Sequence, residues 1–189
     1  MNKKHLLLPL LLAFVIGIGN VWAETYNLVT DANDLSDGDK ILIVSPAGSV
    51  KSSGTTYNYS AQALTSTASS TRLAGSTVTI SSNTITSTNA EEFTLSKSTD
   101  SWKIYSGTKY LTATAKNQLA TGAENSALAF SISIEGTAAT ISCVVGSDNV
   151  KLQLNATVSN SKVNTYFALY TSSQKAVYIF KKESKEPGD

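Results

Sequence analysis

The chain has 189 residues, a formal net charge of +1 and a single histidine, His5. This length suits one ordinary domain with its own core. The near-neutral charge lacks the basic excess that nucleic-acid binding usually shows. We therefore expect one domain and no nucleic-acid partner.

Residues 1–23 have the pattern of a cleavable signal peptide. Lys3 and Lys4 give a basic start, an apolar run follows over 6–18, and Ala23 is a small residue of the kind that a signal peptidase reads. The run is shorter than the roughly 20 residues of a bilayer span, and residue 24 is Glu and not the Cys of a lipoprotein. We expect a secreted or periplasmic protein without a membrane span.

The processed chain has few residues suited to catalysis. His5 lies in the leader, so Ser-His-Asp and Cys-His nucleophile systems and histidine-containing zinc sites are excluded. Cys143 is the one cysteine, which excludes an intramolecular disulfide. Apolar residues at alternate positions over 139–145 predict a half-buried strand with an inert thiol. We expect no enzyme, no metal and no cofactor.

The first element after the leader is an acidic turn. Acidic residues crowd into 31–39, but the calcium-loop template requires a ligand and then Gly where this chain has Leu35 and Ser36. We interpret Asp37-Gly38-Asp39 as a turn that feeds a buried strand over 41–44. The best candidate for any helix is one turn over 34–36.

The stretch Ser49 to Thr88 has little apolar periodicity, which predicts that part of it is a long surface loop. Such loops often carry function. Tyr57 and Tyr59 share one face if their segment is extended, and they are candidate ligand contacts near Arg72. The alternative is that both tyrosines pack inward.

From residue 93 onward, alternating apolar residues predict successive β-hairpins separated by clusters of Ser, Thr, Asp, Asn and Gly. Trp102 shares its face with Ile104 and is expected in the core, whereas Tyr105 is expected on the exposed face. The apolar faces of the other strands contain Phe93 and Leu95, then Leu128, Phe130, Ile132 and Ile134, and finally Val150, Leu152 and Leu154.

A weak internal repeat predicts three hairpin-rich units. The segment 90–93 recurs as 127–130 and again as 177–180, with a closing Phe each time. Three such units would fit a β-trefoil-like fold, and another closed barrel or a sandwich fits almost as well. We expect a single all-β domain over 24–182, followed by a polar tail over 183–189.

The candidate ligand contacts combine aromatic rings with short polar side chains. Tyr105 is the best aromatic candidate, and Asn117 and Gln118 supply donors and acceptors; Tyr57 and Tyr59 complete the set. Sugar rings favour such surfaces, because their C–H faces pack on aromatic rings while their hydroxyls need polar partners.

Three segments also carry a family resemblance. Leu35–Asp39 with the following apolar strand, Phe167–Tyr170 and Gln174–Lys182 resemble a secreted β-rich module that is widespread in Bacteroidota. The resemblance spans nearly the whole processed chain. It implies a module that occurs alone or attached to larger extracellular proteins, and it implies no catalytic residues.

We therefore expect an exported, non-catalytic binding or accessory module with a glycan as its leading ligand. A first alternative is a protein-contact module, either an adhesin-like component or a protease inhibitor that presents the loop over 49–77. A second alternative is a structural envelope protein.

Overall fold

The computed structural model describes residues 23–46, 57–62, 72–159 and 162–184. In these residues there is no α-helix, and none of the helical turns is long or apolar enough to cross a membrane. The expectation of an all-β fold is confirmed. The strands are β1 (Glu24–Leu28), β2 (Lys40–Ser45), β3 (Asn58–Ala61), β4 (Leu73–Val78), β5 (Thr84–Ser87), β6 (Phe93–Ser98), β7 (Ser101–Ser106), β8 (Lys109–Thr112), β9 (Ala120–Gly122), β10 (Ser131–Glu135), β11 (Ala138–Val145), β12 (Asp148–Ser159), β13 (Lys162–Tyr170) and β14 (Tyr178–Lys182).

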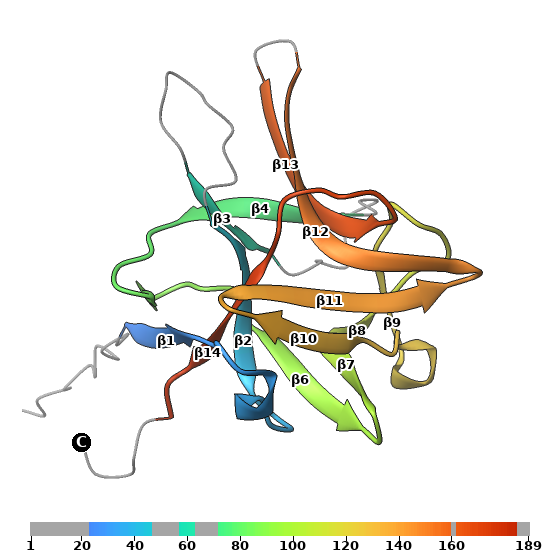
Figure 1. Ribbon diagram of the computed structural model, residues 1–189, viewed down its shortest axis with the longest axis horizontal. Coiled ribbons are helices and arrows are strands. Elements are labelled where there is room, and N and C mark those ends of the chain that lie inside the picture. Colours follow the sequence, from blue (N-terminus) through green and yellow to red (C-terminus); the bar gives the residue numbers. More distant parts are fainter. Residues whose placement is uncertain (1–22, 47–56, 63–71, 160–161, 185–189) are drawn as a thin grey trace, which may run out of the picture.

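The strands form one strongly curled antiparallel sheet with the shape of a half-barrel (Figure 1). The strand order is β10-β11-β12-β13-β4-β3-β2-β6-β7-β8-β9, and β14 joins β2 to β1. Two single bridges add further neighbours. Trp102 in β7 pairs with Phe130 just before β10, and Ala139 in β11 pairs with Val177 just before β14.

The main core lies on the concave side of the sheet and follows the alternation in the sequence. Ala139, Ile141, Cys143 and Val145 are all buried, with exposed fractions of 7% or less. The apolar positions of β6 and β12 are buried in the same cluster. Alternation places successive side chains on opposite faces of a strand, so these runs predict the inward faces correctly.

A second, smaller core explains why the apolar run over 41–44 does not alternate. Ile41 and Ile43 point into the main core, whereas Leu42 and Val44 point to the other side of β2. There they pack with Tyr26 of β1, Ile85 of β5 and Phe180 of β14. Because β1 and β5 cover this outer face, β2 is buried on both sides.

The acidic segment forms the expected turn, but the helical turn lies earlier than expected. Gly38 has a φ of +84° and donates its N–H to the carbonyl of Leu95 at 2.8 Å. The 3-10 turn spans Ala32–Asp34 and not 34–36. The side chain of Asp31 accepts the N–H of Asn33, which starts the turn two residues before the predicted one. A second 3-10 turn spans Glu124–Ser126.

The third segment of the sequence repeat differs from the first two. Phe93 pairs with Ile41 and Phe130 pairs with Trp102 in the main core, where Val177, at the start of the third segment, pairs with Ala139. Phe180, the predicted match, packs instead in the second core. The sequence alone could not show that the Phe residues at the ends of the three repeat segments are divided between two cores.

The stretch predicted as partly loop contains three strands, β3, β4 and β5. Residues 49–56 and 63–71 of this stretch lie outside the described residues. Further along the chain, β12 and β13 form a long hairpin that extends from the body of the domain (Figure 1).

Candidate functional site

Two tyrosines stand opposite each other on the outer face of the sheet. Tyr105 lies in β7 and Tyr110 in β8, and the two are direct cross-strand partners. Their ring centroids are 5.2 Å apart and the ring planes meet at 68°. This edge-to-face geometry is favoured by the charge distribution of aromatic rings. Both side chains remain partly exposed, so together they offer an aromatic surface to solvent.

A tight hairpin turn brings the two rings together. Ser106 pairs with Lys109, which leaves Gly107 and Thr108 as a two-residue loop. Gly107 has a φ of +71°, a conformation that glycine adopts without the steric cost of a Cβ atom. Because loop length and turn type set the register of a hairpin, this loop places the two tyrosines opposite each other.

The tyrosines belong to a row of outward side chains that crosses four strands. Lys40 of β2 is opposite Thr94 of β6, Thr94 is opposite Tyr105, and Tyr105 is opposite Tyr110. Directly opposed residues point to the same face. The neighbours of this row on the inner face, Leu95, Ile104 and Leu111, are fully buried. Because successive side chains on a strand point to opposite faces, the burial of these three residues keeps the side chains of the row on the outer face.

A depression of about 350 Å³ lies along this row. Besides the two tyrosines, it is lined by Asp37, Lys40, Thr94 and Ser96, among others. The Nζ atom of Lys40 donates to Oγ1 of Thr94 at 2.7 Å, and Oδ1 of Asp37 accepts the backbone N–H of Lys97 at 2.7 Å. One cation and one anion are thus held in place beside the rings. We call this surface the tyrosine depression.

The other two predicted tyrosines lie elsewhere. The Tyr59 side chain is 6% exposed and packs in the main core, whereas Tyr57 is 38% exposed. Their ring centroids are 6.4 Å apart. The alternative that both tyrosines pack inward is therefore confirmed for Tyr59 and wrong for Tyr57. Neither residue lines the tyrosine depression.

The predicted polar contacts also lie away from the tyrosine depression. Asn117 is exposed, has a φ of +61° and donates its backbone N–H to the carbonyl of Leu169 at 2.6 Å. The Oε1 atom of Gln118 accepts from the hydroxyl of Thr114 at 3.4 Å. Sequence reasoning missed Tyr110. A two-residue loop at Gly107 would have placed it opposite Tyr105.

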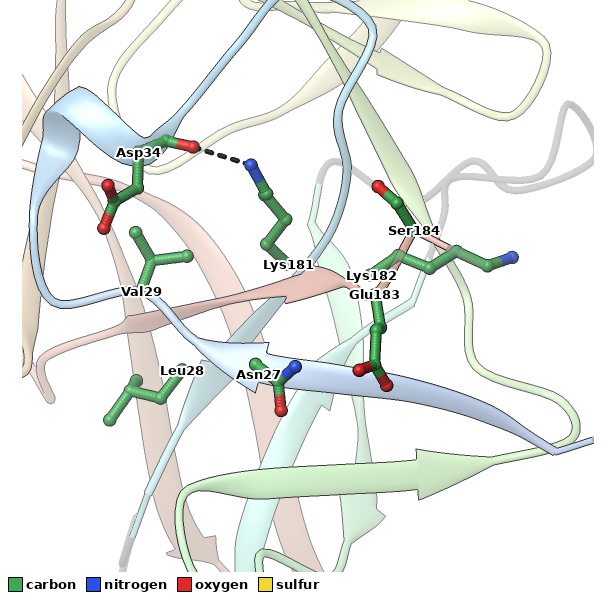
Figure 2. Close-up of a pocket in the computed structure, with 8 residues that line it drawn as sticks. All are labelled: Asn27, Leu28, Val29, Asp34, Lys181, Lys182, Glu183 and Ser184. Atoms are coloured by element: carbon green, nitrogen blue, oxygen red, sulfur yellow. Dashed lines mark hydrogen bonds between the residues drawn. The ribbon is translucent and has the colours of Figure 1, made fainter. Parts of the chain in front are cut away.

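Another depression, of about 360 Å³, lies between β1, β14 and the first 3-10 turn (Figure 2). Figure 2 shows Lys181 donating from Nζ to the backbone carbonyl of Asp34 at 2.7 Å. Lys181 also pairs with Asp39 at 3.1 Å, and Lys182 pairs with Glu92 at 2.9 Å. Both lysines are thus engaged by partners within the fold, and the lining contains no aromatic ring.

The described residues contain no group of three His, Cys, Asp or Glu side chains that could hold a metal ion. Cys143 is buried in β11, as its alternating neighbours predict, and burial raises the pKa of its thiol to about 11. The thiol is therefore protonated at neutral pH. Trp102 is half-buried against the main core, with Nζ of Lys97 5.3 Å from its ring centroid.

The tyrosine depression thus combines an aromatic surface, hydroxyl groups and one fixed charge of each sign. This arrangement suits a neutral polar ligand with an apolar face. No protein-family model matches the chain, and no curated protein or solved structure matches it.

Proposed function

We propose that the protein is an exported, non-catalytic binding module and that the tyrosine depression binds a glycan. The observation that carries this proposal is the edge-to-face pair of Tyr105 and Tyr110 on an open sheet surface that also carries Asp37, Lys40, Thr94 and Ser96. The leader pattern of residues 1–23 supports export, and the resemblance to the Bacteroidota module supports a role outside the cytoplasm.

The chemistry of the depression favours a neutral sugar. A pyranose ring has a face of C–H groups that can pack on Tyr105 or Tyr110, and its hydroxyls can bond to Asp37, Thr94 and Ser96. Asp37 and Lys40 balance each other in charge, so the lining does not select a charged ligand. An open depression on a sheet also admits a sugar that continues into a longer chain.

Protein contact is the second candidate function, and the β12–β13 hairpin favours it. The two strands pair continuously from Lys151 opposite Tyr170 to Ser159 opposite Lys162. The hairpin extends from the body (Figure 1), where a partner can reach it from several sides. The loop that was expected to present an inhibitory segment lies mostly outside the described residues.

We also propose that the half-barrel belongs to a β-trefoil. The support is a ring of six neighbouring strands, β2-β6-β7-β10-β11-β14, in which β14 pairs back to β2. The bridges at Trp102 and Ala139 supply the two contacts that the ladders lack. Between ring strands lie the hairpins β3–β4, β8–β9 and β12–β13, one in each unit.

A glycan array tests the proposed function. The full-length chain is expressed, the exported protein is purified, and the wild type is compared with Tyr105→Ala/Tyr110→Ala. We expect binding to a neutral glycan that the double variant loses. The matched control is Tyr57→Ala, which removes an exposed tyrosine outside the depression and should bind normally. Unchanged binding by the folded double variant, or no binding by the wild type, would contradict the proposal.

A further inference from the structure

The strand registers place three rows of outward side chains in equivalent positions. Each row lies next to an inward pair that belongs to the main core or packs against it, namely Leu95 with Ile104, Ile132 with Ile141, and Ile179 with Ile43. Ile132 is partly buried, and the other five residues are fully buried. The rows are Thr94, Tyr105 and Tyr110; Ser131, Ser142 and Lys151; and Tyr178, Val44 and Ser60. The row of side chains along the tyrosine depression therefore has two counterpart rows in the same chain.

One counterpart is closed by the additional strands. Val44 is fully buried and Ser60 is 7% exposed, since β1 and β5 cover this part of the sheet. Val44 packs in the second core with Tyr26 and Ile85. A sugar ring cannot reach this row while β1 and β5 stay in place.

The other counterpart is open but has the wrong chemistry. Ser142, which takes the place of Tyr105, is half-buried, and Lys151, which takes the place of Tyr110, is exposed. A hydroxymethyl group and an ammonium group can form hydrogen bonds. They offer no flat apolar surface on which the C–H face of a sugar could pack.

We infer that the protein binds glycan at one site per chain, so that a single copy holds one sugar chain and cannot cross-link two. This inference rests on the proposed function of the tyrosine depression. The strands β1 and β5 remove one equivalent position, and the absence of aromatic side chains removes the other. Beyond the proposed function, this inference states the number of binding sites per chain. That number decides whether one copy of the module can connect two glycans or two cells.

Isothermal titration of the exported protein with neutral cello-, xylo-, manno- and laminari-oligosaccharides measures the number of sites. We expect one site for the wild type and none for Tyr105→Ala/Tyr110→Ala. The variant Ser142→Tyr/Lys151→Tyr places a ring pair on the open counterpart and should bind at two sites. When both pairs of substitutions are combined, one site should return. Circular dichroism checks that each variant is folded.

The possible outcomes separate the two proposals. Two or three sites in the wild type would overturn the single-site inference and leave glycan binding intact. A folded Ser142→Tyr/Lys151→Tyr variant that still has one site would overturn the explanation that missing rings silence this row. The absence of binding to every oligosaccharide would overturn the proposed function and the inference with it.

Discussion

The hydroxyl of Tyr26 donates a 2.7 Å hydrogen bond to Oε1 of Glu92, a residue 66 positions away in the sequence. The same Oε1 atom forms an ion pair with Nζ of Lys182 at 2.9 Å, and this Nζ atom lies 3.7 Å from Oε2 of Glu24. This network ties β1 and β14 to the segment before β6. It lies at the edge of the second core, where Tyr26 itself is buried.

Replacing Tyr26 by Phe should lower the free energy of unfolding by about 1 to 2 kcal/mol, because a hydrogen bond to a charged acceptor is lost while the ring stays packed. Urea denaturation followed by tryptophan fluorescence measures the change. Tyr57→Phe is the control, since Tyr57 is exposed, and its stability should match the wild type. Equal stabilities of all three proteins would show that the hydroxyl of Tyr26 contributes nothing.

The same network predicts an acid-sensitive part of the stability. Burial alone would raise the pKa of Glu92, but the hydrogen bonds from Tyr26 and Lys182 outweigh it and hold this pKa below its usual 4.5. The stabilisation is therefore complete above about pH 4.5 and is lost as the pH falls through the lower, folded pKa. Glu92→Gln should be less stable than the wild type at pH 7, and the difference should shrink in acid. Parallel pH profiles would contradict this assignment.

Cys143 should react slowly with a thiol reagent such as DTNB in the native protein and quickly in concentrated urea. Cys143 is 7% exposed, so the reagent reaches its sulfur poorly. Burial also raises the pKa of the thiol to about 11, so little of the reactive thiolate is present at neutral pH. The absorbance of the thiolate that DTNB releases follows the reaction. Rapid labelling in native buffer would mean that β11 opens easily.

Phe130 should be among the costliest residues to truncate. It is fully buried and its backbone pairs with Trp102 in both directions, at 2.8 Å each. Phe130→Ala should lower the free energy of unfolding by about 3 to 5 kcal/mol. Val144→Ala, at a side chain that is 59% exposed, should change it by less than about 0.5 kcal/mol. A small effect at Phe130 would argue against its place in the main core.

The sequence predicted the main core better than it predicted the site. Alternation identified the inward faces of β6, β11 and β12, because one buried face imposes a period of two on a strand. It could not reveal the second core, since the cover of β2 comes from β1 and β5, which are distant in the chain. That cover encloses Phe180 in the second core and not in the main core with Phe93 and Phe130.

For the site, the alternation of side chains along β7 predicted that Tyr105 points outward and that Trp102 packs against the core, as the structure has them. Alternation alone could not identify the residue opposite Tyr105 on the next strand, because cross-strand neighbours depend on the length of the loop between the strands. Asn117 and Gln118 were grouped with Tyr105 on residue type. The backbone bond of Asn117 to Leu169 holds that segment against β13 instead.

The pairing of β1 with β14 joins the two ends of the domain, with Tyr26 opposite Lys182. The second core cannot be complete before β14 has been synthesised, because Phe180 of β14 is one of its residues. Contacts of such long sequence separation form slowly, because a large loop must close first. The edge of β1 that pairs with β14 therefore stays unpaired until all the intervening strands have been made.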